Sequence, residues 1–213
     1  MSANSGTGVS DAPATAASAR VDWSSVGERG HGVQFYADDG QLLDVLTRYV
    51  GTALITADVA VVLGTASHRR ALERALKSRG LDIHIATRQG RYIAADAHEL
   101  LAKILRDGWP DEKRFASSVG SLVKRAVHLA AKRRLRVVVF GELVALVWSA
   151  ARPAAALRLE ELWNDLARSE PFALCCAYPM NGFSVSQAAP FLRVCAQHTH
   201  VFPAPHVAAA DSA

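Results

Sequence analysis

The side chains best placed to bind a small molecule follow short apolar runs of the sequence. Tyr36, Asp38 and Asp39 close the segment HGVQFYADD, in which Val33 to Tyr36 has the composition of a buried strand. Open α/β sheets collect ligands at the carboxyl ends of their strands, so these three residues can line a pocket. Asp38 or Asp39 can equally cap the helix that follows. The segment has no glycine-rich run and no Gly-Lys-Ser/Thr, so it lacks the residues that hold nucleotide phosphates.

A second set of polar residues follows the apolar run Val59 to Leu63. Thr65, His68 and Arg69 supply a hydroxyl, an imidazole and a guanidinium at what we expect to be another strand end. An arginine can hold a carboxylate or a phosphate through two parallel hydrogen bonds. The alternative is that these residues are solvated members of the first turn of a helix.

Glu142 follows the β-branched run Val137 to Phe140 and is a third candidate for ligand binding. A carboxylate at a buried strand end needs a partner, which can be a cation, an arginine such as Arg69, or a donor on a ligand. A structural ion pair is the alternative. The sequence contains no Gly-x-Ser-x-Gly or His-Glu-x-x-His motif and no convincing nucleophile with its base, so we expect no enzymatic activity.

Two stretches are candidates for contact with another protein. The segment Asp107 to Arg114 combines glycine, tryptophan, proline and charges, a composition suited to a lid or a partner-binding loop. Its Trp109 can contact a ligand, or it can cover the edge of the core. Further along, a helical stretch presents polar side chains, two of them four residues apart on one face. The candidate partner-binding residues are Trp109, Arg114, Glu160, Glu161 and Asn164.

The sequence predicts neither a metal nor a cofactor. His198, His200 and His206 lie close together in the chain, but no carboxylate or cysteine spacing completes a metal site around them. Cys175 and Cys176 are adjacent, so in a strand they point to opposite faces and cannot chelate one ion together. We expect both cysteines to be small core residues.

The composition indicates one domain. Of the 213 residues 50% are hydrophobic, which is enough for one good-sized core. The 24 Lys and Arg against 20 Asp and Glu are too balanced for a dedicated nucleic-acid binder. The three cysteines form neither a Cys-x-x-Cys pair nor an even disulfide framework, which favours a reducing cytoplasm. No apolar run approaches the ~18 residues of a membrane span. We therefore expect a cytoplasmic protein without nucleic-acid or membrane partners.

Apolar runs alternate with amphipathic stretches from residue 31 onwards, which predicts a three-layer α/β domain with a mostly parallel sheet. Ile83 to Ile85 and Tyr92 to Ala94 are weaker strand candidates than the runs named above. Residues 1–28 are rich in Ser, Ala, Gly and Thr, and we expect a disordered leader there. Residues 184–213 have the pattern of a loose tail with room for one short helix near 188–197.

Seven segments in order, among them HGVQFYADDGQLLDVL, DGWPDEKRF and RVVVFGELVALVW, resemble the MEDS family, the methanogen/methylotroph sensory domain. The resemblance covers residues 29–183. It implies a RecA/KaiC-like core without its phosphate-binding loop, acting as an input module that senses small hydrocarbon derivatives. In the family this domain often sits beside histidine kinase or DNA-binding output domains. Because residues 184–213 have no room for such a domain, the expected partner is a separate histidine kinase or transcription regulator.

The residues and the resemblance together favour a non-catalytic sensory module of a bacterial-type regulator that binds a small organic ligand. Two alternatives stay open. One is a degenerate nucleotide-binding protein or weak ATPase that retains Glu142 and uses Arg69 or Arg114 for phosphate, and the other is a ligand-independent protein-interaction regulator. A DNA-binding protein is the least favoured reading, because it rests on the basic cluster Lys132 to Arg136 without a recognition helix.

Overall fold

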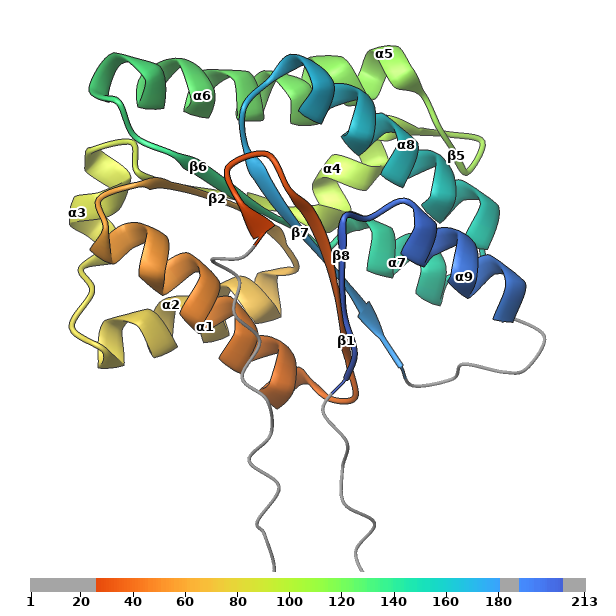
Figure 1. Cartoon of the computed structure of the whole chain (residues 1–213), viewed down its shortest axis with the longest axis horizontal. Coiled ribbons are helices and arrows are strands. Elements are labelled where there is room, and N and C mark those ends of the chain that lie inside the picture. Colours follow the sequence, from red (N-terminus) through yellow and green to blue (C-terminus); the bar gives the residue numbers. More distant parts are fainter. Residues whose placement is uncertain (1–25, 181–187, 205–213) are drawn as a thin grey trace, which may run out of the picture.

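The computed structural model describes residues 26–180 and 188–204 and has a six-stranded sheet at its centre (Figure 1). The strand order is β3-β2-β6-β7-β1-β8, and neighbouring strands are parallel at every step. Because the strands are parallel, their carboxyl ends all reach the same edge of the sheet. The strands are β1 His31–Tyr36, β2 Val59–Gly64, β3 Tyr92–Asp96, β6 Val137–Gly141, β7 Ala173–Pro179 and β8 His200–Phe202.

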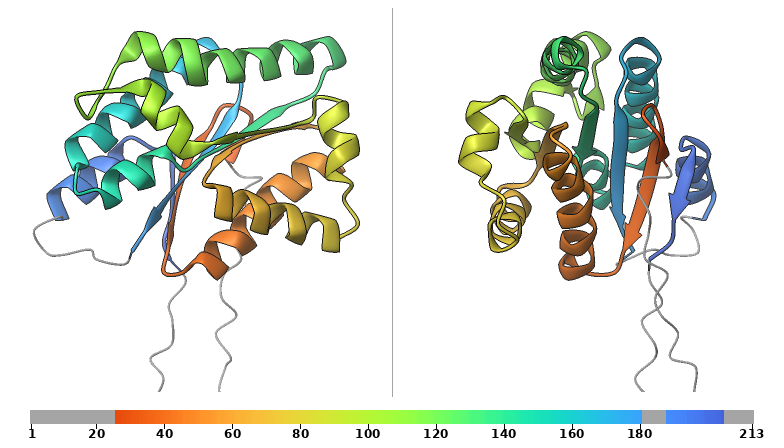
Figure 2. Two further views of the ribbon diagram at one scale, coloured as in Figure 1. Left: turned by 180° about the vertical axis from the view of Figure 1, so that it is seen from behind. Right: turned by 60° about the vertical axis from the view of Figure 1, so that its left-hand side comes forward.

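Helices cover both faces of this sheet and give three layers (Figures 1 and 2). This arrangement confirms the predicted three-layer α/β class with a mostly parallel sheet, whereas the specific likeness to RecA and KaiC stays a prediction. One face packs against α1 Asp39–Ile55, α2 Ala66–Ser78 and α3 Ile83–Arg88. The other face packs against α4 Ala97–Ile104, α5 Glu112–Phe115, the π-helix η2 Ala116–Gly120, α6 Ser121–Arg133, α7 Leu143–Ser149, α8 Pro153–Ser169 and α9 Ala188–Ala196.

The adjacent strands β2 and β6 form the part of the sheet that carries two of the candidate ligand residues. Every residue of β2 is buried, as expected for a strand covered by helices on both faces. At the start of the two strands, the Asp58 carboxylate accepts hydrogen bonds from the backbone N–H and the Nε–H of Arg136, at 2.9 and 3.0 Å. This link fixes the register of β2 against β6 and therefore the relative position of their carboxyl ends.

The segment expected to be a lid or partner-binding loop forms a small hairpin of β4 Leu105–Arg106 and β5 Trp109–Pro110. Its turn residues Asp107 and Gly108 have φ values of +52° and +78°. Positive φ at both turn positions matches the twist of the flanking strands, and glycine adopts it without strain. Because β5 packs against α8, the hairpin is attached to the helical layer.

Two predictions of local structure are wrong. Ile83 to Ile85 begins helix α3 instead of a strand, because the Asp82 carboxylate caps that helix by accepting a hydrogen bond from the N–H of Ile85. In the expected loose tail, the short helix is present as α9, but residues 200–202 also form β8 and pair with β1. A strand of three residues is too short to show an alternating pattern, which is why β8 was not predicted.

The chain ends are described only in part. Most of the expected leader, residues 1–25, and two parts of the expected tail, residues 184–187 and 205–213, lie outside the described ranges. Val26 packs into the core on the α1 side of the sheet, so ordered structure begins before residue 29. None of the helices in the described ranges combines the length and apolarity needed to cross a membrane.

Candidate functional site

The carboxyl ends of β2 and β6 place Thr65 and Glu142 side by side. Glu142 follows β6 directly, and its backbone N–H continues the sheet by donating to the carbonyl of Leu63 at 2.9 Å. Its side chain turns back, so that one carboxylate oxygen accepts a hydrogen bond from the backbone N–H of Thr65 at 2.7 Å. Glu142 is 2% exposed. The buried carboxylate that the sequence predicted is therefore anchored to the end of the neighbouring strand.

His68 supplies the main side-chain partner of Glu142. It lies in the first turn of α2, which Thr65 caps by accepting a hydrogen bond from the N–H of His68. His68 Nδ1 is 2.7 Å from the second oxygen of Glu142, and its Nε2 is 3.4 Å from the carboxylate of Asp39 at the start of α1. The imidazole thus spans the space between β6 and α1. The hydrogen bond to Glu142 is the main cause that raises the pKa of His68, although burial opposes it.

Tyr36 closes this group at the end of β1. Its side chain is buried, and burial raises the pKa of its phenol well above the usual range, with further contributions from the negative charges of Glu142 and Asp39. The hydroxyl therefore stays protonated and can act as a neutral donor. We call Tyr36, Asp39, Thr65, His68 and Glu142 the carboxyl-edge cluster.

Asp38 has a different role from Asp39. Its carboxylate caps α1 by accepting a hydrogen bond from the N–H of Gln41 at 2.9 Å, while the Gln41 side chain accepts one from the N–H of Ala37. This reciprocal pattern satisfies the N-terminus of α1 from within the chain. Two carboxylates at this position repel phosphate, so the helix terminus is poorly suited to the anionic ligand that a free N-terminus attracts.

Arg69 does not pair with Glu142, which was one of the expected partners. Its Nη2 lies 3.0 Å from the carboxylate of Asp96 at the end of β3, and its Nε–H donates to the carbonyl of Gly64 at 3.1 Å. The guanidinium thereby links α2 to the outermost strand of the sheet. Arg69 is a neighbour of the carboxyl-edge cluster, and its charge is already balanced by Asp96.

Trp109 and Arg114 lie apart from this cluster. The hairpin that carries Trp109 sits beside α5 and α8, away from the end of β1 (Figure 1). The Trp109 side chain is 50% exposed and Arg114 is exposed as well. Among the residues that the structure describes, no hydrogen bond or ion pair joins either of them to Tyr36 or His68. Both residues are therefore available to a partner, but they do not line the same site as the other candidates.

The polar face expected on α8 is only partly at the surface. Glu161 is partly exposed and pairs with Arg158 at 2.9 Å. Glu160, in contrast, is completely buried, and it accepts a hydrogen bond from the Tyr178 hydroxyl at 2.7 Å. Asn164 is half-buried and contacts His31 and Gln197. The prediction of a partner surface is thus wrong for Glu160, which falls on the same helical face as the buried apolar residues of α8, whereas it stays a prediction for Glu161 and Asn164.

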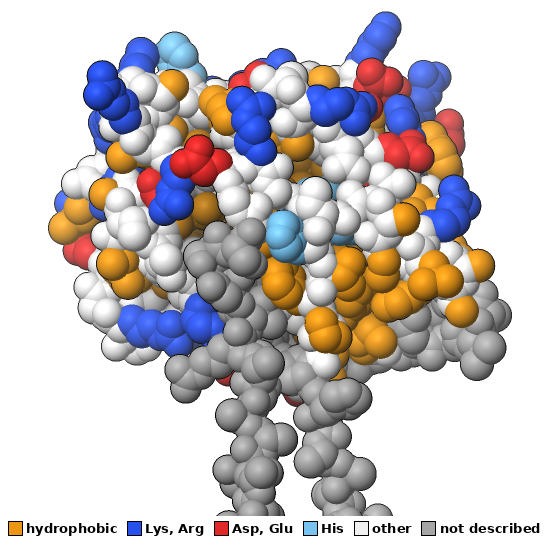
Figure 3. Space-filling view, in the orientation of Figure 1, with side chains coloured by type: hydrophobic (Ala, Val, Ile, Leu, Met, Phe, Trp, Pro, Cys, Tyr) orange, Lys and Arg blue, Asp and Glu red, His pale blue; other side chains and the backbone are white. Residues whose placement is uncertain are grey.

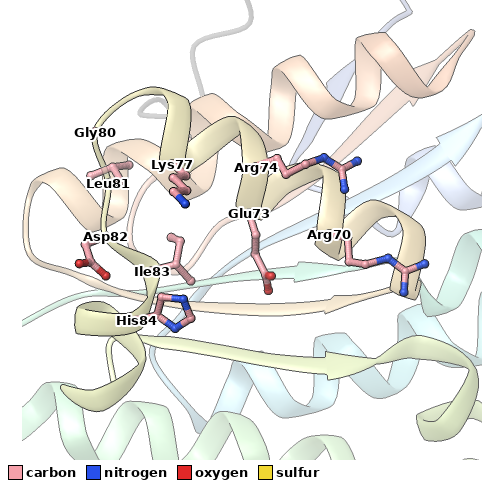
Figure 4. Close-up of a pocket in the computed structure, with 9 residues that line it drawn as sticks. All are labelled: Arg70, Glu73, Arg74, Lys77, Gly80, Leu81, Asp82, Ile83 and His84. Carbon is pink, nitrogen blue, oxygen red and sulfur yellow. The ribbon is translucent and has the colours of Figure 1, made fainter.

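Two surface features were not predicted from the sequence. A groove of about 590 Å³ runs between α2 and α3, and the side chains of Arg70, Glu73, Arg74 and Lys77 extend along it (Figure 4). Leu81 and Ile83 also line this groove, so it combines charged groups with apolar surface. Elsewhere, hydrophobic side chains gather over the region of α9 and β8 (Figure 3), where Leu192 and Val201 are 66% and 45% exposed. Exposed apolar groups of this kind are typical of contact surfaces.

The His68 arrangement predicts how stability depends on pH. Because the folded-state pKa of His68 is raised, its contribution is fully present below the unfolded pKa of about 6.5 and is lost as the pH rises through the folded pKa. We expect the free energy of unfolding, measured with urea between about pH 6 and pH 8.5, to fall more steeply in the wild type than in His68→Gln. The exposed His128→Gln is the matched control and should follow the wild type. Parallel curves for the wild type and His68→Gln would contradict this coupling.

The fold and the cluster define a parallel α/β domain that has a polar site at the carboxyl edge of its sheet and no phosphate-binding loop. The family described as the methanogen/methylotroph, DcmR sensory domain, MEDS, matches residues 30–196. The chain therefore belongs to the MEDS family, as its sequence segments predicted, and the match extends through α9.

Comparison with solved structures supports the fold independently. The uncharacterized protein PH0321 from Pyrococcus horikoshii, solved in complex with an unknown peptide, superposes with a TM-score of 0.60 at 14% sequence identity. The alignment covers 83% of this chain and 78% of that chain. At this identity the likeness shows a shared fold and nothing more. Comparison with curated proteins gives no match.

Proposed function

We propose that this chain is a non-catalytic sensory module that binds a small organic ligand at the carboxyl-edge cluster and signals to a separate protein. Membership of a sensory-domain family supports the sensory role. The contacts of His68 support the carboxyl-edge cluster as the ligand site. One side of the imidazole is held by the buried Glu142 at 2.7 Å, whereas the other side meets the exposed Asp39 at 3.4 Å. The second contact is long and solvent-accessible, so a ligand can replace it.

The donors in the cluster indicate the chemistry of the ligand. His68 Nε2 and the Tyr36 hydroxyl can both donate to an oxygen or another acceptor on a small molecule, and the carbon framework of Tyr36 offers an apolar surface beside them. A small molecule with one acceptor group and a hydrocarbon part fits this combination. If it displaces Asp39 from His68, it loosens the start of α1 from α2. Such a ligand shifts the domain between two conformations only if it binds one of them more tightly.

The electrostatics of the site disfavour the nucleotide-binding alternative. Asp38 and Asp39 stand where a nucleotide-binding domain presents backbone N–H groups and a lysine to phosphate. Glu142, which in an ATPase would act on the metal or the attacking water, is engaged with Thr65 and His68. These contacts support a ligand without phosphate and a protein without hydrolytic activity.

For the partner, the exposed hairpin with Trp109, together with Arg114 and Glu161, supplies aromatic and charged groups on one side of the molecule. Aromatic residues and arginines contribute disproportionately to protein interfaces. The solved relative holds a peptide of unknown identity, which makes peptide recognition by this fold reasonable. A histidine kinase or a transcription regulator in the cytoplasm is the partner we propose, and the unpaired cysteines are consistent with a reducing compartment.

Thermal unfolding against a ligand panel tests this function. We expect one or more small halogenated, C1 or hydrocarbon-derived compounds to raise the unfolding midpoint, because a ligand at ~100 times its Kd stabilises the folded state by about 2.7 kcal/mol. His68→Gln should abolish the shift, and His128→Gln should retain it.

Other outcomes favour the alternatives. A shift with ATP and Mg²⁺ that is lost in Glu142→Gln would instead favour a nucleotide-binding protein. No shift with any compound, combined with partner binding that Trp109→Ala abolishes, would favour a ligand-independent interaction protein.

A further inference from the structure

A second polar cluster lies inside the molecule, on the face of the sheet covered by α8 and α9. It joins His31 at the start of β1, Glu160 of α8, Cys176 of β7 and His198, which follows α9. One donor atom from each residue lies within 4.8 Å of all the others. The side chains of Glu160 and His198 are completely inaccessible to solvent, and that of His31 is 4% exposed. Four groups of this kind in one buried space need a physical explanation.

The hydrogen bonds of Asn164 determine which ring nitrogen of His31 carries a proton. Both N–H groups of the Asn164 amide serve Gln197, donating to its backbone carbonyl at 3.1 Å and to its side-chain oxygen at 3.0 Å. The amide oxygen therefore faces His31 Nδ1, at 2.9 Å, and it can only accept. His31 must carry a proton on Nδ1. In the neutral imidazole this leaves a lone pair on Nε2, which points into the cluster.

His198 has the same arrangement. Its Nδ1 lies 2.7 Å from the backbone carbonyl of Val194, which can only accept, so this nitrogen is also the protonated one. Its Nε2 is buried and has no hydrogen-bond partner among the described residues, and it lies 3.5 Å from an oxygen of Glu160. In the neutral imidazole this nitrogen turns a lone pair toward the carboxylate, a costly contact that either a proton on Nε2 or a cation between the two groups relieves.

The remaining groups do not supply enough protons to fill this space. The Tyr178 hydroxyl donates to one oxygen of Glu160 at 2.7 Å, and the Cys176 thiol donates to the other at 3.4 Å. The same thiol lies 3.3 Å from His31 Nε2, so its single proton is shared between that nitrogen and Glu160. No other donor among the described residues reaches the two imidazole nitrogens. When both imidazoles are neutral, the centre of the cluster therefore holds more lone pairs than protons.

We propose that His31, Glu160, Cys176 and His198 bind a divalent transition-metal ion, for which zinc is the best match. Imidazole, thiolate and carboxylate together form a typical zinc donor set, and sulfur disfavours magnesium and calcium. Bonds of about 2.0–2.3 Å in a tetrahedron place ligand atoms roughly 3.3–3.8 Å apart. Three of the separations fall in this range: His31 Nε2, Cys176 Sγ and Glu160 Oε2 lie 3.3, 3.4 and 3.4 Å from one another. His198 Nε2 lies 3.5 Å from the other oxygen of Glu160 and within 4.8 Å of the remaining ligand atoms. On binding, Cys176 releases its thiol proton to solvent and ligates as the thiolate.

The surroundings of the two histidines fit the same role. Metal-bound histidines nearly always donate their second nitrogen to a carbonyl or a carboxylate, as His31 and His198 do through Asn164 and Val194. A pocket of about 460 Å³, lined in part by His31, Asn164 and Gln197, leads from solvent to this side of the cluster. Since the ligands come from β1, β7, α8 and the segment after α9, the ion would tie α9 to the central sheet. This site is independent of the carboxyl-edge cluster.

Metal titration of the full chain, purified without a histidine tag and stripped with a chelator, tests the proposal. We expect one Co²⁺ per chain, with visible d–d absorption and a thiolate-to-cobalt charge-transfer band, and we expect Zn²⁺ to raise the unfolding midpoint. Cys176→Ser should lose the charge-transfer band. Cys175→Ser, in the same strand but on the opposite face of the sheet, should keep it.

Two further variants keep the test decisive if Cys176→Ser folds poorly. His198→Asn should remove the zinc-induced rise in the midpoint, whereas the neighbouring His200→Asn should retain it. Asn164→Ala should weaken zinc binding about 10–100-fold, because it removes the group that orients His31. An unchanged midpoint with Zn²⁺ and a cobalt spectrum without charge transfer would overturn the proposal and leave a buried hydrogen-bonded cluster. Equal zinc binding by the wild type and His198→Asn would also overturn it.

Discussion

Replacing Glu142 with alanine is expected to lower the free energy of unfolding by about 3 kcal/mol. The carboxylate is buried and accepts two hydrogen bonds, one from the backbone N–H of Thr65 and one from the imidazole of His68. Alanine leaves the Thr65 N–H without a partner at the end of β2 and removes the negative charge that favours protonated His68. Both losses fall on the folded state, because the unfolded chain is solvated.

Glu142→Gln is the matched variant for this prediction. The glutamine oxygen can still accept from Thr65, and its amide can donate to neutral His68, so the loss of stability should be about 1 kcal/mol. The variant should, however, flatten the pH dependence that His68 confers, since the carboxylate is the main cause of the raised pKa of His68. Urea unfolding at about pH 6 and pH 8.5 measures both effects. Equal stability losses in the two variants would show that charge, and not the hydrogen bond to Thr65, holds this edge of the sheet.

The sequence reveals the candidate ligand residues one strand at a time. Each apolar run ends where a strand ends, so Tyr36, Thr65 and Glu142 were all placed correctly at carboxyl ends. What the sequence does not carry is the order of the strands in the sheet. Without it, the partner of Glu142 stayed open between a cation, an arginine such as Arg69 and a ligand donor. In the structure, β2 beside β6 brings His68 to Glu142, and Arg69 pairs with Asp96 on the edge strand β3.

The buried cluster shows a different limit of sequence reasoning. The ligands are far apart in the sequence: more than a hundred residues separate His31 from Cys176, and α9 lies between Cys176 and His198. No local spacing therefore joins them. One signal was nevertheless present: Glu160 lies between Leu159 and Trp163 on the apolar face of α8, where a solvated carboxylate is not expected. A charged residue inside an apolar helical stripe indicates a buried polar partner, and here it marks the cluster.

Trp163 supports both sites, and its replacement by alanine should have the largest effect of any variant considered. The side chain is completely buried, and its ring packs edge-on against Phe115, with a centroid separation of 5.3 Å, and against Phe172 at 6.2 Å. The ring also lies against Gly141, where an added Cβ would be 3.3 Å away. Gly141 is the residue before Glu142, and Trp163 follows Glu160 by one helical turn. Loss of the ring therefore disturbs the carboxyl end of β6, beside Glu142, and the position of Glu160 in the buried cluster.

We expect Trp163→Ala to lower the free energy of unfolding by about 3–5 kcal/mol, because truncation of a large buried aromatic side chain loses its transfer free energy and leaves a cavity. Trp163→Phe is the discriminating control. The indole Nε1 is buried without a hydrogen-bond partner among the described residues, so phenylalanine removes an unsatisfied donor while keeping most of the ring contacts. The loss in the free energy of unfolding for Trp163→Phe should be about 1 kcal/mol, measured by urea unfolding followed by circular dichroism. A loss in Trp163→Phe as large as that in Trp163→Ala would mean that the indole nitrogen has a partner and that packing is not the main contribution of this side chain.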